Sequence, residues 1–253
     1  MTKTFTEDER IRRVWDIELV KELMNSRVYY IADDRREDEL ADLWVQKPEN
    51  QATASYGSNW GYYTGMENIR AWYVDAHNAD LAKQAAENGK AINQGNMYAR
   101  PVTTGLVELA ADGKTAKGLW YILGQVTKAL PDGTADARWT LGKLAADFVK
   151  EGDAWKLWHL VDSVDVDCEA GKAYDDYPVF EDWSADSANP VRKEFGKPTI
   201  EKLTHDVTFN WWDNYPPMPP KYETFTDDIS YGPEGHKDPE NIIYRAQEGR
   251  NWQ

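Results

Sequence analysis

Residues 138–167, RWTLGKLAADFVKEGDAWKLWHLVDSVDVD, contain two strand-like runs joined by the turn sequence Glu151-Gly152-Asp153. The runs cover 138–150 and 155–167, and their side chains follow the two-residue period of a β-strand. Because the connection is a short turn, the two strands should be antiparallel. This stretch therefore predicts a hairpin with long arms.

Two further strand-like runs precede this hairpin, at 102–109 and 115–128. Short turn sequences follow each of them, Ala-Asp-Gly-Lys at 111–114 and Pro-Asp-Gly at 131–133. We therefore predict a meander of four antiparallel strands over the middle of the chain.

Helical patterns come before these strands. Thr6 and Glu9 form the capping box T-E-D-E, which predicts a helix start. Apolar residues then recur at helical spacing, so a helix should run to about Ile31 with one broad apolar stripe. The stripe consists of Ile11, Val14, Trp15, Ile17, Leu19, Val20, Leu23, Met24 and Val28.

The segment between this helix and the meander changes pattern three times. The charged run 33–38 should end the first helix, and helical spacing resumes over 39–44. Thr, Tyr and Trp residues punctuated by glycines between 52 and 65 suit two short strands joined by a tight turn. Residues 66–88 return to helical spacing. Helices followed by an antiparallel meander predict the α+β class.

The C-terminal third of the chain, residues 169–253, has a different composition. It holds nine of the twelve prolines, which favour extended or turn backbone over long helices. It also holds more aromatic residues than a solvated tail would carry. We predict a domain over 1–168 and a C-terminal arm over 169–253 that packs on the core or on a neighbouring subunit.

The chain is strongly acidic, with 44 acidic residues, 29 basic residues and a net charge of −15. This balance disfavours nucleic acid and anionic membranes as partners. The single cysteine, Cys168, allows no intrachain disulfide, and the four histidines lack the spacing of a zinc site. With neither a signal-like nor a membrane-spanning stretch in the sequence, we expect a cytoplasmic protein.

Several chemistries have no motif in this sequence. It contains no G-x-S-x-G elbow, Walker loop, G-x-G-x-x-G after a strand, C-x-x-C or H-E-x-x-H. We therefore expect no nucleotide cofactor, no metal and no covalent serine or cysteine catalysis. Aromatic residues make up 13% of the chain, which instead favours pockets for flat molecules and subunit contacts.

Three stretches carry a resemblance to a known family. They are DIELVKEL at 16–23 with DELADLW at 38–44, DGKTAKGLWY at 112–121, and ADFVKEGDAWKLWHL at 146–160. In this order they resemble the nuclear transport factor 2-like superfamily, within it the SnoaL-like group that includes scytalone and bile-acid dehydratases. The resemblance covers about residues 10–167 and leaves the C-terminal arm outside it.

The resemblance implies a cone-shaped fold in which a curved antiparallel sheet wraps around the N-terminal helices and forms a cavity. It does not imply one reaction. The same cone hosts dehydratases, isomerases, cyclases, lyases that release formaldehyde from aromatic lignin fragments, and non-catalytic transport or docking modules. Function must therefore be argued from the site.

The resemblance also suggests acid-base residues near the end of the first helix. Dehydratases of the group have a Tyr there and an Asp about five residues later, which matches Tyr29 with Asp34 and nearly matches Tyr30 with Asp33. A phenol can hydrogen-bond a developing oxyanion, and a carboxylate in a dry pocket can exchange a proton near neutrality. The alternative is a solvated helix end whose charged residues pair with one another.

Two histidines and one asparagine bear on the same chemistry. The dehydratases have a His before the third strand, where this chain has Asn96; Asn exchanges no proton but could orient a substrate oxygen together with Tyr98. His159, on the last predicted strand, would be the best-placed general base if it faces the cavity, although either face is possible. His77 is a weaker candidate, because it could be a helix-surface residue.

Cations and flat rings supply candidate substrate contacts. Arg100 and Arg138 could hold a phenolate or a carboxylate, although carboxylates of this acidic chain are alternative partners. The aromatic candidates, which could equally serve core packing, are Trp44, Trp60, Tyr63, Trp72 and Trp120.

The leading hypothesis is a cofactor-independent lyase that acts on a hydroxylated, hydrophobic aromatic small molecule. It would release formaldehyde by carbon–carbon cleavage of the retro-aldol type, or water by dehydration, through acid-base catalysis in a hydrophobic cavity. The alternative is a non-catalytic ligand-binding or docking module with the same fold. Carbohydrate binding or hydrolysis by paired carboxylates fits the composition but not the family pattern. An exposed outer sheet face and an aromatic arm also predict a homo-oligomer.

Overall fold

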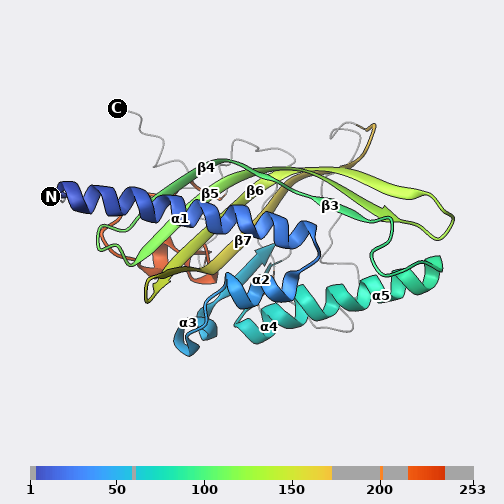
Figure 1. Ribbon diagram of the computed structural model, residues 1–253, viewed down its shortest axis with the longest axis horizontal. Coiled ribbons are helices and arrows are strands. Elements are labelled where there is room, and N and C mark those ends of the chain that lie inside the picture. Colours follow the sequence, from blue (N-terminus) through green and yellow to red (C-terminus); the bar gives the residue numbers. More distant parts are fainter. Residues whose placement is uncertain (1–3, 59–60, 173–199, 202–215, 237–253) are drawn as a thin grey trace.

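The computed structural model describes residues 4–58, 61–172, 200–201 and 216–236 (Figure 1). The helices are α1 (Glu7–Ala32), α2 (Arg36–Asp42), α3 (Pro48–Thr53), α4 (Met66–Arg70), the π-helical segment η1 (Ala71–Ala76), α5 (His77–Asn88) and the 3-10 turns η3 (Asp227–Ile229) and η4 (Pro233–His236). The strands are β1 (Ser55–Ser58), β2 (Gly61–Thr64), β3 (Met97–Ala99), β4 (Val102–Leu109), β5 (Thr115–Ala129), β6 (Ala135–Glu151), β7 (Ala154–Glu169) and β8 (Ile200–Glu201). In these described ranges no helix is long and apolar enough to cross a membrane.

The first helix begins and ends where the sequence predicts. The amide of Glu9 donates to Thr6 Oγ1 at 3.2 Å and the amide of Thr6 donates to Glu9 Oε2 at 2.8 Å, which completes the capping box. Asp33 caps the C-terminal end, and Asp34 follows in the left-handed region with φ of 57°. Asp is one of the few residues that tolerates this conformation, and it turns the chain into α2.

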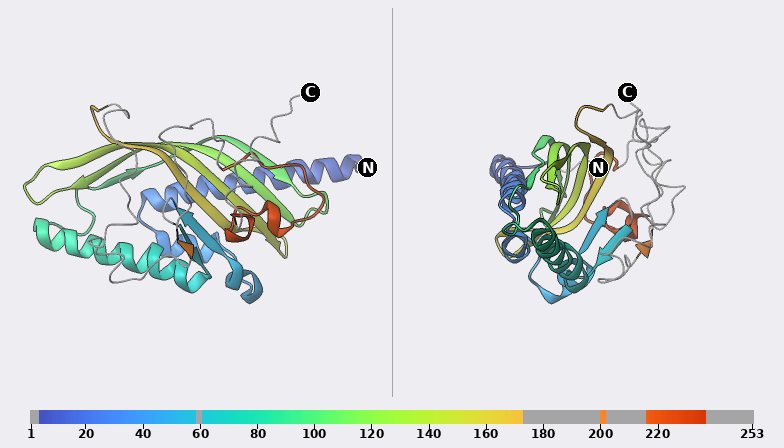
Figure 2. Two further views of the ribbon diagram at one scale, coloured as in Figure 1. Left: turned by 180° about the vertical axis from the view of Figure 1, so that it is seen from behind. Right: turned by 90° about the vertical axis from the view of Figure 1, so that its right-hand side faces the viewer.

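The strands form one curved sheet in the order β3-β5-β6-β7-β1-β2-β8, and β4 also pairs with β5 (Figure 2). Strands β4 to β7 form the predicted antiparallel meander. Strand β1 runs parallel to β7, which places Tyr56 beside Leu160 and Ser58 beside Asp162. The predicted α+β architecture, with N-terminal helices and a curved, unclosed sheet, is confirmed.

One face of the sheet, here called the inner face, packs against the helices. Side-chain alternation along β6 and β7 directs Leu144, Phe148 and Leu160 to this face. They are buried in one hydrophobic cluster with Val20 and Met24 of α1. The helices and the inner face therefore share the main core of the molecule.

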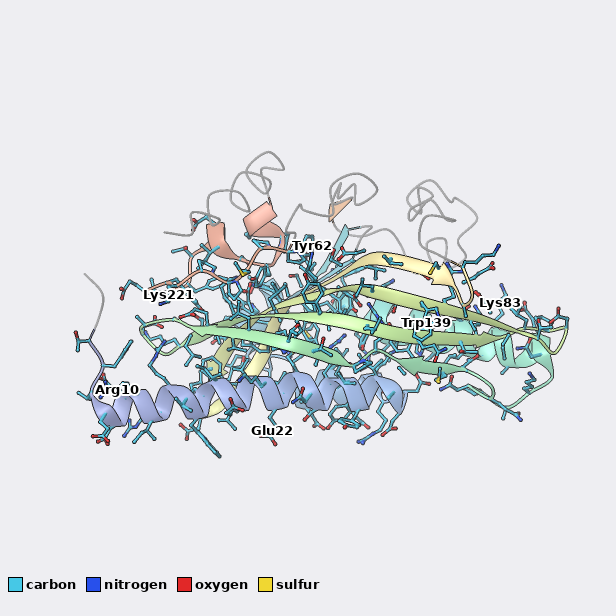
Figure 3. All side chains as sticks on the ribbon, turned by 90° about the horizontal axis from the view of Figure 1, so that it is seen from above. Arg10, Glu22, Tyr62, Lys83, Trp139 and Lys221 are labelled. Atoms are coloured by element: carbon cyan, nitrogen blue, oxygen red, sulfur yellow. The ribbon has the colours of Figure 1, made fainter. Side chains whose placement is uncertain are left out.

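The opposite face, here called the outer face, is covered in part by residues 216–236, which belong to the predicted C-terminal arm (Figure 3). Tyr231 of this segment is buried against Ala145 and Val161, and its carbonyl accepts a hydrogen bond from the Tyr62 hydroxyl at 2.9 Å. The parts of the arm at 173–199, 202–215 and 237–253 lie outside the described residues.

A buried ionic cluster fixes this segment to the outer face. Lys117 and Asp147 are fully buried, and Lys117 Nζ donates to Asp147 Oδ1 and to the Ile229 carbonyl, both at 2.5 Å. Asp147 Oδ2 lies 2.9 Å from His159 Nδ1 and accepts from Ser230 Oγ at 3.2 Å. Burial alone would raise the pKa of Asp147, but Lys117 and His159 more than offset this and hold the pKa below its usual value.

The expected apolar stripe of α1 is wrong in its N-terminal half. Ile11, Val14 and Trp15 are between 62% and 66% exposed. Arg13 donates to the carbonyls of Leu109 and Ala110 at 2.9 and 2.8 Å, which turns the Arg13 side of the helix toward the sheet. Residues 11, 14 and 15 lie on the other side of the helical wheel from residue 13 and therefore face solvent.

Some elements were not predicted. Helix α3 begins with Pro48 in its first turn, and the short strand β3 pairs its Tyr98 with Val126 of β5. The expected helix over 66–88 is present, but it contains the π-helical segment η1. Such segments commonly occur at functional sites, and this one ends where His77 begins α5.

The buried pair on the outer face gives a stability prediction. The Lys117→Met substitution should lower the free energy of unfolding by about 3–5 kcal/mol, because it leaves the Asp147 charge buried without its cation. Urea denaturation measures the change. Lys21→Met, which removes a lysine from an exposed pair with Glu18, should cost less than about 1 kcal/mol. Equal effects of the two substitutions would contradict the assignment.

Candidate active site

An ion pair between β7 and the loop before β4 lies at the centre of the candidate site. Arg100 Nη1 donates to Asp162 Oδ2 at 2.6 Å, and Nη2 donates to Oδ1 at 2.8 Å. Arg100 Nη1 also donates to the Tyr98 hydroxyl oxygen at 2.9 Å. Gly124 lies in β5, and a β-carbon there would be only 2.5 Å from Arg100 Cγ. The aliphatic part of the Arg100 side chain therefore occupies the space that a side chain at position 124 would need. The pair thus holds the Tyr98 hydroxyl in place.

A second buried carboxylate joins the helices to this region. Glu39 is fully buried; its Oε1 accepts from Arg27 Nε at 2.9 Å and from Trp44 Nε1 at 3.1 Å. Its Oε2 accepts from the Tyr73 hydroxyl at 2.6 Å. Every oxygen of this carboxylate is therefore hydrogen-bonded, which is the condition for burying a charge at tolerable cost.

Aromatic rings fill the space between the two carboxylates. The Tyr56 ring lies 5.2 Å from Tyr73, 4.9 Å from Trp72 and 6.3 Å from Trp44, measured between ring centres. Tyr63 stacks on Trp72 at 4.5 Å. Burial and the nearby Asp162 raise the pKa of Tyr56, so its hydroxyl stays protonated. These rings form a flat, apolar layer beside charged groups, here called the aromatic wall; it belongs to the main core, and Trp72 is its partly buried member.

A carboxylate–imidazole pair lies where α1 turns into α2. Asp34 Oδ1 lies 2.6 Å from His77 Nε2, and both side chains are mostly buried. Burial and the neighbouring Arg36 lower the pKa of His77, an effect that Asp34 only partly opposes. The imidazole is therefore neutral near pH 7, with its Nε2 proton donated to Asp34. Its Nδ1 is then left as a proton acceptor, as in a catalytic dyad.

Arg36 connects this Asp34–His77 dyad to the tyrosines Tyr73 and Tyr98 of the inner face. Its guanidinium carbon lies 4.6 Å from the centre of the Tyr73 ring and 5.9 Å from that of the Tyr98 ring. Arg36 Nη1 donates to the Tyr73 carbonyl at 3.3 Å. The dyad, the two tyrosines and the Arg100–Asp162 pair therefore form one contiguous set, here called the inner-face site.

Of the five catalytic residues predicted from sequence, only Asp34 belongs to the inner-face site. Tyr29 is 71% exposed on α1. Tyr30 donates to Asp42 at 2.6 Å at the surface, a hydrogen bond that raises the pKa of Tyr30. Asp33 is the exposed cap of α1. The observed partner of Asp34 is thus a histidine rather than a tyrosine of the first helix.

His159 lies on the outer face of the sheet, in the buried ionic cluster with Asp147. Its ring stacks on Trp158 at 4.2 Å, and Ser230 Oγ lies 3.1 Å from the same Nδ1 atom that faces Asp147. A serine–histidine–aspartate triad needs two different ring nitrogens, so this arrangement is not one. The register of β7 therefore assigns His159 to anchoring the C-terminal segment.

The predicted substrate-binding residues that the structure describes divide into three groups. Tyr98 and Arg100 belong to the inner-face site, and Trp44, Tyr63 and Trp72 belong to its aromatic wall. The remaining residues lie elsewhere: Trp120 packs on Phe148 in the core, Asn96 bonds Gln84 and the Ala129 amide, and Arg138 pairs with Asp167. Trp60 lies outside the described residues.

Sequence reasoning missed Tyr56, Asp162 and Arg36 and undervalued His77. Tyr56 and Asp162 meet only because β1 pairs parallel with β7, a long-range pairing that no local pattern signals. His77 lies one helical turn after Tyr73, and this spacing was the one available hint. Across the described ranges, no group of three or more His, Cys, Asp or Glu side chains could hold a metal ion.

Comparisons with known proteins place the fold in a family. The family model described as SnoaL-like domain matches residues 12–161, which is more than half of the chain, so the chain belongs to the SnoaL-like family. The match spans the helices and the meander and ends before the C-terminal segment. No curated protein matched the chain.

Solved structures show a likeness of fold only. An NTF2-like protein with a cystatin-like fold from Novosphingobium aromaticivorans is 18% identical, covers 65% of this chain and 91% of its own, and has a TM-score of 0.45. A hexachlorocyclohexane dehydrochlorinase, LinA-type3, from Novosphingobium barchaimii is 15% identical, with 64% and 96% coverage and a TM-score of 0.44. A putative scytalone dehydratase, also from Novosphingobium aromaticivorans, is 14% identical, with 64% and 97% coverage and a TM-score of 0.42.

The electrostatics of the dyad give a direct prediction. The imidazole of His77 should titrate below the usual value of about 6.5, because burial and Arg36 both disfavour its charged form. In Arg36→Gln the pKa of His77 should rise, and in Asp34→Asn it should fall further. The pH dependence of the His77 ring signals in NMR spectra measures all three. In the control Arg35→Gln, which changes an exposed neighbour, the pKa of His77 should not change. An unchanged pKa of His77 in Arg36→Gln would contradict the position of Arg36 beside the imidazole.

Proposed function

We propose that this chain is a cofactor-independent lyase that acts on a hydroxylated aromatic small molecule, with His77 as its general base. The observation that carries the proposal is the 2.6 Å contact between Asp34 and His77 beside the aromatic and charged inner-face site. A neutral imidazole with one nitrogen held by a carboxylate accepts a proton on the other nitrogen.

The inner-face site also contains a group suited to the leaving oxygen. The Tyr98 hydroxyl oxygen accepts a hydrogen bond from Arg100, so its own proton is left to donate to a substrate oxygen. The cation beside it stabilises negative charge that develops on that oxygen. His77 and Tyr98 would thus serve as base and acid, with Arg36 between them.

The same two groups support either form of elimination. In dehydration, His77 takes a proton from carbon, a double bond forms, and the neighbouring hydroxyl leaves as water after receiving a proton from Tyr98. In retro-aldol cleavage, His77 takes the proton of a hydroxymethyl group and the carbon–carbon bond breaks to give formaldehyde. The released electron pair then forms a double bond and expels an oxygen leaving group, which Tyr98 protonates.

The aromatic wall supports a flat substrate. Trp72 stacks on Tyr63 at 4.5 Å and meets Tyr56 edge to face at 4.9 Å, and such rings bind aromatic groups. The Tyr73 and Tyr98 rings under Arg36 extend this surface toward the dyad. An oriented imidazole with a lowered pKa beside these rings favours an enzyme over a purely non-catalytic binding module.

Substitutions in the dyad test the proposal. Metal-free protein is incubated with a panel of hydroxylated aromatic dimers and steroids, and water loss and formaldehyde release are measured. On a substrate found this way, His77→Asn and Asp34→Asn should each lower kcat by about 10²–10⁴-fold, because the first removes the base and the second removes the carboxylate that orients it. The matched controls Tyr29→Phe and Asp33→Asn should change kcat less than about twofold. A full-rate His77→Asn variant, or no turnover across the panel, would refute the proposal.

The pH profile supplies a second test. Since His77 must be neutral to accept a proton, kcat/KM should be constant near pH 7 and fall as the pH drops through the lowered pKa of His77, below about 6.5. In Arg36→Lys the acid limb should stay in place, because the cation is kept. A profile that stays flat as the pH falls below the usual pKa of histidine, about 6.5, would exclude His77 as the base.

A further inference from the structure

Within the described part of the chain, Arg36 is a cation without a balancing carboxylate. The other arginines around the inner-face site have acidic partners within 4.0 Å, namely Arg27 with Glu39, Arg35 with Asp38, Arg70 with Glu37 and Arg100 with Asp162. Among the residues that the structure describes, no carboxylate lies within that distance of Arg36. In a chain with a net charge of −15, an unmatched arginine inside a site calls for an explanation.

Within the described ranges, the hydrogen bonds of Arg36 leave the Nε side of its guanidinium without an acceptor. Nη1 donates to the Tyr73 carbonyl at 3.3 Å, whereas Nε is buried and has no hydrogen-bond partner in the ranges described. A buried donor left without an acceptor destabilises the folded protein until an acceptor binds it. The edge formed by Nε and Nη2 is the one that receives a carboxylate side-on, and its Nε is the buried donor that has no acceptor among the described residues.

The same chain uses this edge elsewhere. Arg27, Arg35 and Arg138 each direct Nε at a carboxylate oxygen, at 2.9, 2.8 and 2.6 Å. The Nε atoms of Arg36 and Arg100 are both buried without a partner in the described ranges, but Arg100 holds Asp162 through its other two nitrogens, whereas no acidic side chain of the described residues reaches Arg36. A carboxylate from outside the chain would complete the same arrangement.

The surroundings of Arg36 define the rest of the ligand. The Tyr73 and Tyr98 rings lie within 6 Å of its guanidinium, at 4.6 and 5.9 Å, and favour a planar group bound next to the anion. His77 is close enough for the Arg36 charge to influence its protonation. An anion on Arg36 would therefore be held beside the base.

We propose that Arg36 binds the carboxylate of an aromatic acid through its Nε and Nη2 edge, so that the substrate of the inner-face site is an aromatic carboxylate. This specificity rests on the proposed function, which it narrows to acidic substrates. The carboxylate is bound and not changed in the reaction. Its role is to fix the ring on the Tyr73 and Tyr98 surface with the reacting carbon toward His77.

Ligand binding tests the proposal without turnover. Benzoate, benzamide and inorganic phosphate are titrated into the full-length protein, and Kd is measured by NMR or calorimetry. Benzoate should bind at least about tenfold tighter than benzamide, as expected for a paired, partly buried charge. Bound benzoate should also raise the pKa of His77, because it offsets the Arg36 charge that lowers it.

Variants separate Arg36 from a general charge effect. In Arg36→Gln the preference for benzoate over benzamide should disappear, and in Arg36→Lys it should be reduced, since lysine keeps the charge but not the planar edge. Arg35→Gln, which removes a neighbouring exposed arginine, should keep the full preference. Circular dichroism shows that each variant is folded.

Several binding results would contradict carboxylate binding at Arg36. Equal Kd values for benzoate and benzamide, binding of neither, tighter binding of phosphate, or a preference that survives Arg36→Gln would overturn the carboxylate assignment. Turnover of neutral substrates by His77 without any benzoate preference would overturn this inference and leave the proposed function standing. A preference for benzoate in a protein that turns over no acidic or neutral substrate would overturn the proposed function and leave carboxylate binding at Arg36 standing.

Discussion

The bidentate ion pair between Arg100 and Asp162 determines the layout of the inner face. It places a carboxylate under a sheet where water is largely excluded, which is tolerable only when each oxygen has a donor. Glu39 meets the same requirement through Arg27, Trp44 and Tyr73. Because these donors come from α1, η1 and the segment after α2, Glu39 holds the helices to one another, while the Arg100–Asp162 pair joins β7 to the loop before β4.

The buried charges on the outer face also need hydrogen-bond partners, and here the C-terminal segment supplies several of them. Lys117 and Asp147 are as deeply buried as Glu39, but apart from His159 their other partners come from residues 229–231 of the C-terminal segment. The charges therefore require the segment to be in place, and the segment in turn covers apolar residues such as Val161. Within the described residues, the sheet thus has a structural ionic cluster on one face and a polar cluster with an unsatisfied donor on the other.

That asymmetry is the basis for assigning function to the inner face. On the outer face the buried polar groups of the ionic cluster are paired within the chain. On the inner face Arg36 retains a buried donor without an acceptor among the described residues, beside an imidazole whose pKa is lowered. Unpaired groups next to a perturbed base are typical of sites that await a ligand, whereas closed networks are typical of structural anchors.

Local chemistry in the sequence determined the elements of this protein. The capping box at Thr6 started α1, and the glycine turns at Gly113, Gly133 and Gly152 separated the long strands, because these signals act over a few residues. The tertiary structure alone decided the site. The direction of His159 depended on the register of β7, and the contact between Asp34 and His77 joined residues 43 positions apart. Side-chain direction and long-range contact follow from packing of the whole chain, which no short stretch encodes.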